Sequence, residues 1–330
     1  MSPVVFARIL LAASVVALPA QTKPVAPRQD PPATPAQAKP AAQAAFEKGF
    51  ELQVALDRAG FSVGIIDGAP GANTRKAATA YQSAHGSPVA VGTEPALTQY
   101  AITDADVAGP FAENIPDDMI QKSKLPGLYY SSVAEALGER FHTSPEVLKR
   151  LNPSATFAAG EMLTVPNVTV VEMPVATPAD EATKAPSSPA PKSGGVTVTV
   201  SKGTSAATVK DASGKVIFYA PVTSGSQHDP LPIGKWTVTA VVRNPTFNYN
   251  PDLFWDADPA HTKARIPAGP NGPVGVVWID ISKPHYGLHG TPEPQTVGHT
   301  QSHGCVRLTN WDATRLAGLV SKGTAVVFTR

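Results

Sequence analysis

The sequence has almost no cysteine, since Cys305 is the only one among 330 residues. No disulfide bond can therefore form within the chain, although the exported compartment inferred below would permit one. An unpaired thiol in an exported protein needs an explanation, and catalysis provides one. An excess of charge is lacking as well, because 27 Lys and Arg face 26 Asp and Glu, for a net charge of +1. This balance offers no electrostatic basis for a nucleic-acid partner.

Long apolar runs are confined to the start of the sequence. Arg8 precedes an apolar run over residues 9–18, which has the length of a signal-peptide core and is short for a membrane span. Ala20 supplies a small residue at the expected cleavage site. We expect residues 1–20 to be a signal peptide, with a retained membrane anchor as the alternative. The protein is then exported, to the periplasm or the cell wall of a bacterium. No later apolar run is long enough for a transmembrane helix.

Proline and glycine are plentiful, with 34 and 26 residues, and this suggests several small domains rather than one large one. Two Pro/Ala-rich stretches without hydrophobic periodicity are expected to be linkers. The predicted order is a signal peptide at 1–20, a linker at 21–44, a first module at 45–102, a connector at 103–124, a second module at 125–170, a second linker at 171–195 and a C-terminal domain at 196–330.

The stretch 285–310 holds the lone cysteine and four of the eight histidines, namely His285, His289, His299 and His303. The order His303-Gly304-Cys305 suits a short extended segment, in which side chains two residues apart share a face. Gly304 has no Cβ, so a substrate backbone could approach closely there. A thiol is mostly protonated at neutral pH, and a neighbouring imidazole can take its proton. Composition alone does not decide which histidine does so.

His289, followed by Ser302-His303-Gly304-Cys305-Val306-Arg307, resembles the H…SHGC signature of L,D-transpeptidases with a YkuD-type catalytic domain. Residues 232–236, 249–251 and 267–275 are also similar to the periplasmic members of that family, and the resemblance covers roughly residues 194–330.

The resemblance implies roles for particular residues. Cys305 would be the nucleophile, and His289 would be the general base and later the general acid. The carbonyl of Gly290 would orient that base. Ser302, His303 and Gly304, with the Cys305 amide, fall where the family shapes its oxyanion and substrate pocket. Arg307 would either bind a substrate carboxylate or serve as a structural ion-pair partner.

Two other interpretations compete for these residues. A lone cysteine is often an inert small hydrophobic residue. Zinc could be held by the four histidines and the thiol, but their spacings match no standard ligand pattern. We expect His285 and His299 to be solvated loop residues, and we expect no metal and no cofactor.

The sequence before residue 171 resembles two glycan-binding families. Residues 45–102 are similar to the small helical peptidoglycan-binding domain, a three-helix bundle. Its first helix would follow the spacing of Phe46 and Phe50, its second would be capped by Asn73-Thr74, and its third would lie around residues 93–100. Residues 125–170 look like LysM, a βααβ glycan-binding module. Its opening at residues 127–130 departs from the family pattern, so glycan binding and a structural remnant both stay open.

Strict alternation of apolar and polar residues at 196–200 predicts a half-buried strand at the start of the C-terminal domain. Further strands are predicted at 207–211, 215–222, 235–242, 274–281 and 325–328, with a helix at 310–320. The predicted fold class is multidomain α+β: a small N-terminal helical bundle, a central βααβ LysM-like module and a mostly-β YkuD-like catalytic domain.

The resemblance implies an acyltransferase of cell-wall peptidoglycan. Cys305 would attack the bond after the third residue of a tetrapeptide stem, release D-Ala and form a thioester. A second stem or an outer-membrane lipoprotein would be the acceptor, and water as acceptor would give an L,D-carboxypeptidase. The expected partners are therefore stem peptides and glycan. The alternative from another class is a non-catalytic cell-wall-binding protein.

Overall fold

The computed structural model describes residues 35–174 and 195–330, and residues 41–330 form one compact unit. The predicted signal peptide, the start of the first linker and most of the second linker lie outside the described residues. Residues 35–44, which were expected to belong to the first linker, lie instead in helix α1 (Pro35–Arg58). None of the helices within the described ranges is both long and apolar enough to cross a membrane.

Two helices form the first part of the compact unit, α1 and α2 (Ala72–His85). Phe46, Phe50 and Val54 are buried on one face of α1, as their four-residue spacing predicts. The expected cap of α2 is wrong: Gly71 is the N-cap and makes no side-chain cap bond. Asn73 instead donates from Nδ2 to the carbonyl of Val297, 2.9 Å away.

The third helix predicted around residues 93–100 is also wrong, because strand β1 (Leu97–Ala101) lies there. β1 pairs antiparallel with β2 (Met162–Pro166), so that Leu97 is opposite Pro166. Between these strands lie helices α3 (Asp104–Val107), α4 (Met119–Lys122), α5 (Val133–Arg140) and α6 (Pro145–Leu151). Ser132 and Ser144 cap α5 and α6 by accepting backbone N–H bonds. The strand in front of α5 is thus β1, and residues 127–130 form no strand.

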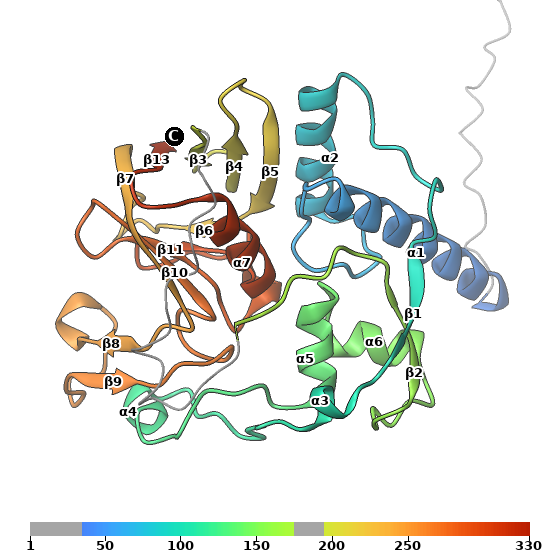
Figure 1. Cartoon of the computed structure of the whole chain (residues 1–330), viewed down its shortest axis with the longest axis horizontal. Coiled ribbons are helices and arrows are strands. Elements are labelled where there is room, and N and C mark those ends of the chain that lie inside the picture. Colours follow the sequence, from blue (N-terminus) through green and yellow to red (C-terminus); the bar gives the residue numbers. More distant parts are fainter. Residues whose placement is uncertain (1–34, 175–194) are drawn as a thin grey trace, which may run out of the picture. The chain divides into compact units, whose positions relative to one another are not determined.

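The C-terminal part is mostly β, as predicted, and is built on a nine-stranded sheet in the order β5-β4-β3-β13-β7-β10-β11-β12-β6. Its strands are β3 (Thr197–Ser201), β4 (Ala206–Lys210), β5 (Val216–Pro221), β6 (Thr223–Ser224), β7 (Gly234–Arg243), β10 (Val277–Ile281), β11 (Gly287–His289), β12 (Val306–Arg307) and β13 (Ala325–Thr329). β8 (Phe247–Tyr249) and β9 (Ala264–Ile266) form a separate hairpin, and two short 3₁₀ helices are η1 (Pro251–Leu253) and η2 (Pro294–Thr296). Helix α7 (Asn310–Leu319) packs on β10 and β11 (Figure 1).

The described chain before the second linker consists of a front segment (residues 35–102) and a central segment (residues 103–170). The front segment packs directly on this sheet. Phe61 forms a parallel bridge with Tyr219 of the edge strand β5. Ser62 donates its N–H to the Tyr219 carbonyl at 2.8 Å, and the Tyr219 N–H donates to Gly60 at 2.9 Å. An open strand edge presents unpaired backbone groups that invite aggregation, so this contact protects β5.

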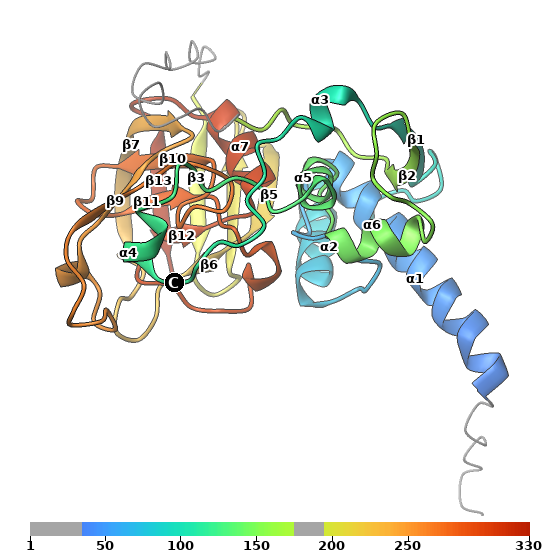
Figure 2. The same ribbon diagram turned by 90° about the horizontal axis from the view of Figure 1, so that it is seen from below.

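A buried polar cluster joins three distant segments at α7, which lies beside α5 in both views (Figures 1 and 2). Arg315 of α7 donates to both carboxylate oxygens of Asp57 at 3.0 and 2.8 Å. His142 contacts Asp57 at 3.0 Å, and the Ser62 hydroxyl donates to Asp312 at 2.7 Å. Burial opposes ionisation of Asp57, but His142 and Arg315 together hold its pKa well below the usual range.

Candidate active site

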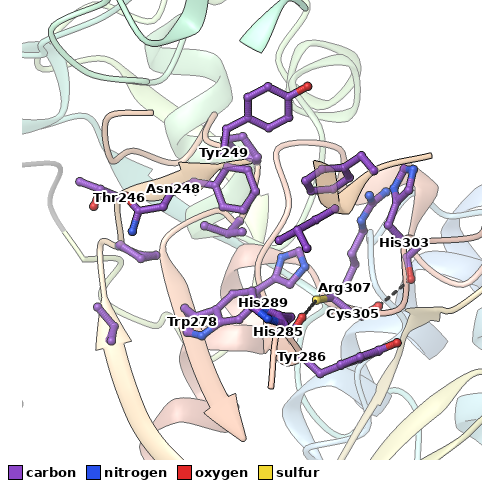
Figure 3. A pocket seen from close by; sticks show the side chains of 18 of the residues that line it. Thr246, Asn248, Tyr249, Trp278, His285, Tyr286, His289, His303, Cys305 and Arg307 are labelled. Carbon is purple, nitrogen blue, oxygen red and sulfur yellow. Dashed lines mark hydrogen bonds between the residues drawn. The ribbon is translucent and has the colours of Figure 1, made fainter. Parts of the chain in front are cut away.

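Strand pairing brings His289 and Cys305 together, although 15 residues separate them in the chain. β11 and β12 run parallel, with Leu288 opposite Val306 and His289 opposite Arg307. Residues in register share a face, and Cys305 precedes Arg307 by two positions, so the three side chains project to one side. His289, Cys305 and Arg307 line the same cavity (Figure 3).

The imidazole of His289 is buried and has one defined partner. Its Nδ1 lies 2.7 Å from the carbonyl oxygen of Gly290. A carbonyl only accepts, so Nδ1 carries the proton and Nε2 keeps a free lone pair. Trp278 stacks on the ring with centroids 5.4 Å apart. The pKa of His289 is lowered to about 4, mainly by burial and also by the Arg307 charge, while the Gly290 carbonyl opposes the shift.

The thiol of Cys305 is partly exposed, and its sulfur lies 3.7 Å from the carbonyl oxygen of His285. Burial raises the pKa of Cys305, while the Gly287 N–H and Arg307 oppose that rise. A raised thiol pKa and a lowered imidazole pKa mean that both groups are neutral at pH 7. The pair therefore rests as thiol and imidazole, and attack by the sulfur would require transfer of the thiol proton to the imidazole.

Gly304 is required by the turn that carries the thiol. Its φ is +98°, and a Cβ there would lie 2.7 Å from the Tyr286 ring. The close approach that the sequence suggested for a substrate is therefore made by Tyr286. Ser302 holds the same turn, because its hydroxyl accepts from the Gly225 N–H at 2.7 Å and donates to the Cys305 carbonyl at 2.6 Å.

The backbone amides at the turn and the Arg307 guanidinium remain available to a ligand. No bond from the Gly304 or Cys305 N–H to another described residue is present. Within the described ranges, Arg307 has no carboxylate within ion-pair distance. His303 is engaged, since its Nε2 lies 2.9 Å from the Asp256 carboxylate, on the loop after β8.

The cavity has a volume of about 1670 Å³, and sequence reasoning missed several side chains that line it. Trp278 and Tyr286 line the cavity beside His289 and Cys305. The Asp118 carboxylate lies 2.7 Å from Nε2 of His261, and the Tyr249 hydroxyl contacts the other ring nitrogen at 3.0 Å. The alternation of strand 277–281 could have indicated Trp278. No sequence signal relates Asp118 of the connector to His261.

The metal-binding alternative finds no support in this geometry. In the part of the chain that the structure describes, no group of three or more His, Cys, Asp or Glu side chains is placed to hold a metal ion. His285 and His299 are exposed, as expected of loop histidines.

The fold and site define a mostly-β domain with a cysteine and a histidine on one wall of a cavity. Residues 195–328 match the family model of YkuD, the L,D-transpeptidase catalytic domain. The C-terminal domain is therefore an L,D-transpeptidase catalytic domain of the YkuD family, and the resemblance in the sequence is confirmed for this part of the chain.

Individual proteins show the same likeness over shorter stretches. The chain is 46% identical over 61 residues to the putative L,D-transpeptidase YkuD of Bacillus subtilis, which is 18% of this chain and 37% of that protein. It is 30% identical over 114 residues to the putative L,D-transpeptidase YqjB of the same organism, covering 33% of this chain and 57% of that one. An L,D-transpeptidase structure from Mycobacterium smegmatis matches with 21% identity and a TM-score of 0.34, over 41% of this chain and 58% of that one. The chain thus spans between 37% and 57% of the length of these two curated relatives.

Proposed function

We propose that this protein is an L,D-transpeptidase that acts on peptidoglycan tetrapeptide stems through a thioester on Cys305. The observation that carries the proposal is the state of His289. Its Nδ1 is committed to the Gly290 carbonyl, so Nε2 is the nitrogen left for a thiol that lines the same cavity.

The reaction then follows from this pair. The Cys305 proton moves to Nε2 of His289 as the sulfur attacks the carbonyl carbon after the third stem residue. The tetrahedral intermediate collapses, the C–N bond breaks, and His289 protonates the departing amine of D-Ala. A thioester remains on Cys305. An acceptor amine attacks the thioester, gives a proton to His289 and releases the thiol, which takes that proton back.

Two groups near the thiol suit the charges of the substrate. The backbone N–H groups of Gly304 and Cys305, which bond no other described residue, would stabilise the oxyanion, and losing one such donor typically costs about 10²–10³ in rate. Arg307 has no carboxylate of the described residues beside it, which favours the carboxylate-binding role over the structural ion pair.

The acceptor determines the biological outcome. The amine of a second stem gives a cross-link, a lysine of an outer-membrane lipoprotein gives protein attachment, and water gives a carboxypeptidase. Mass spectrometry of the muropeptides produced by the purified protein distinguishes the three. The protein would act after export, in the periplasm or cell wall, with the peptidoglycan-binding-like and LysM-like segments contacting glycan.

Acylation by a carbapenem tests the proposal. The wild-type protein should gain the mass of one carbapenem and should release D-Ala from a disaccharide tetrapeptide, whereas Cys305→Ala should do neither. A wild-type protein that forms no adduct and releases no D-Ala would instead support the non-catalytic cell-wall-binding alternative.

A further inference from the structure

A carboxyl group from the central segment is inserted into the C-terminal domain. Glu139 lies on α5, is 6% exposed, and accepts from Nδ2 of Asn310 through both oxygens, at 2.8 and 3.0 Å. The Tyr130 hydroxyl donates to the same carboxyl at 2.9 Å. Asn310 is the first residue of α7 and is fully buried. The contact therefore joins two residues 171 positions apart in the chain.

Asn310 in turn fixes the backbone beside the catalytic base. Its Nδ2 also donates to the Pro270 carbonyl at 3.2 Å, and its Oδ1 accepts from the Val276 N–H at 3.2 Å. A Cβ on Gly290 would lie only 2.2 Å from that Oδ1, so the Asn310 amide rests directly on Gly290. Packing thus requires glycine at 290, whereas the carbonyl that His289 contacts is a backbone group that any residue would supply.

Through Gly290, these contacts bear on the imidazole of His289. The Gly290 carbonyl accepts from Nδ1 of His289 at 2.7 Å and so selects the tautomer with Nε2 free. We propose that Glu139 is a positioning residue for the catalytic base: it orients the Asn310 amide, which holds Gly290 where its carbonyl fixes His289. The inference rests on the proposed function in assigning His289 the role of base. The central segment then serves the reaction itself, whether or not it also contacts glycan.

The protonation of Glu139 is compatible with this role. Burial raises its pKa to about 8, while the bonds from Tyr130 and Asn310 oppose the rise. The carboxyl is mostly neutral at pH 7, so Glu139→Gln preserves its charge and offers an amide oxygen to Asn310. Glu139→Ala and Glu139→Met remove the acceptor, and methionine nearly fills the same volume.

Docking of the central and front segments does not depend on Glu139 alone, and this provides a matched control. The Ser62 hydroxyl bonds Asp312 on the same helix α7, and among the described residues no hydrogen bond joins Ser62 to Asn310 or Gly290. Ser62→Ala removes one buried contact between segments and leaves the path to His289 intact. A merely structural role predicts similar effects of the Ser62 and Glu139 substitutions.

The test measures His289 and the thiol separately in the full-length protein. Nitrogen-15 NMR of the imidazoles should show Nδ1–H on His289 in the wild type, in Glu139→Gln and in Ser62→Ala. In Glu139→Ala and Glu139→Met the tautomers should mix and His289 should titrate at lower pH, because the carbonyl bond favours the charged ring. Carbapenem acylation should slow by about 10–100-fold in these two variants, since small misplacements of catalytic groups cost this much, and should recover in Glu139→Gln.

The outcomes separate the two proposals. If the wild type is acylated and the His289 signals of Glu139→Met match the wild type, the positioning role is overturned. If the signals change but the wild type is never acylated, the positioning role stands and the proposed function fails. Circular dichroism identifies any variant that does not fold. If Glu139→Ala does not fold, Glu139→Met still provides the test.

Discussion

In the proposed mechanism, the protonation of His289 sets the pH range in which Cys305 can attack. The base must be neutral to accept the thiol proton, and burial together with Arg307 lowers the pKa of His289 to about 4. The rate of carbapenem acylation should therefore be maintained as pH falls from 7 to 5 and should decline as pH passes through about 4. An acid limb near 6.5, the ordinary histidine value, would show that the imidazole is not held in the buried environment described here. Stopped-flow fluorescence over pH 3 to 8 provides the measurement.

Gly304 offers a second test at the same scale, with Gly323 as its matched control. Both have positive φ, +98° and +93°, but a Cβ at 304 meets the Tyr286 ring at 2.7 Å whereas a Cβ at 323 meets nothing within 4 Å. Alanine at either position should cost about 1–2 kcal/mol from the backbone. Gly304→Ala should add a steric cost and displace the thiol, so that acylation falls at least about 10-fold. Urea unfolding and acylation kinetics should separate the two variants, and equal behaviour would contradict the role of Tyr286.

The sequence could single out Cys305 and His289, which the structure places at one cavity, because their local motif is specific and lies within 17 residues. It could not single out the residues that position them. Glu139, Tyr286 and Trp278 become neighbours only through the pairing of strands and the docking of α5, and no local pattern encodes these contacts. The same limit explains Ser302: the motif marks it as important, but only the structure shows its hydroxyl bonded within the turn.

At the scale of elements, helix α7 links the site to the front and central segments. Its N-cap Thr309 accepts from the Asp312 N–H at 3.2 Å, and the Asp312 carboxylate accepts from the Ser62 hydroxyl at 2.7 Å. Thr309→Ala should cost about 1 kcal/mol of stability and should slow acylation, because Asn310 follows the cap directly. Ser144→Ala removes the N-cap of α6, where Ser144 accepts from the Val147 N–H at 3.4 Å, and should cost a similar amount while leaving acylation unchanged, because α6 carries no residue of the path from Glu139 to His289. The free energy of unfolding and the acylation kinetics are measured for both cap variants. If the two substitutions slow acylation equally, this role of α7 is contradicted.

The strands of the C-terminal domain were predictable because alternation reports directly on a half-buried sheet. β3, β4, β5, β7 and β13 all lie within a residue or two of the predicted ranges. β1 was not predictable as a strand, since its partner β2 follows only after the connector and helices α3 to α6. A short exposed strand is stabilised mainly by pairing with another strand, and the local sequence does not show which strand that is.

On the scale of the whole molecule, the described segments meet through buried titratable groups rather than through apolar contacts alone. Burial raises the pKa of Asp312 to about 7, with Arg315 opposing the rise and Asp57 adding to it. Burial also lowers the pKa of His142, against the attraction of Asp57. Such groups make the free energy of unfolding depend on pH in opposite directions, so the net profile of the wild type does not isolate any one of them.

A difference between two variants isolates Glu139. Its pKa is near 4.5 when unfolded and about 8 when folded, so the folded state binds more protons between these values and its stability falls as pH rises through this window. The amide introduced by Glu139→Gln does not titrate. The variant should therefore gain stability relative to the wild type on going from pH 5 to pH 8, by up to about 1.4 kcal/mol per pH unit. Below pH 4.5, where both side chains are neutral in both states, the difference should be constant.

Urea unfolding at pH 4, 5, 6.5 and 8 measures this difference in the free energy of unfolding. Ser62→Ala is the control, and its stability relative to the wild type should not rise between pH 5 and pH 8. A flat difference for Glu139→Gln would mean that the carboxyl stays ionised against Asn310, and that the contact between α5 and α7 is a charged one.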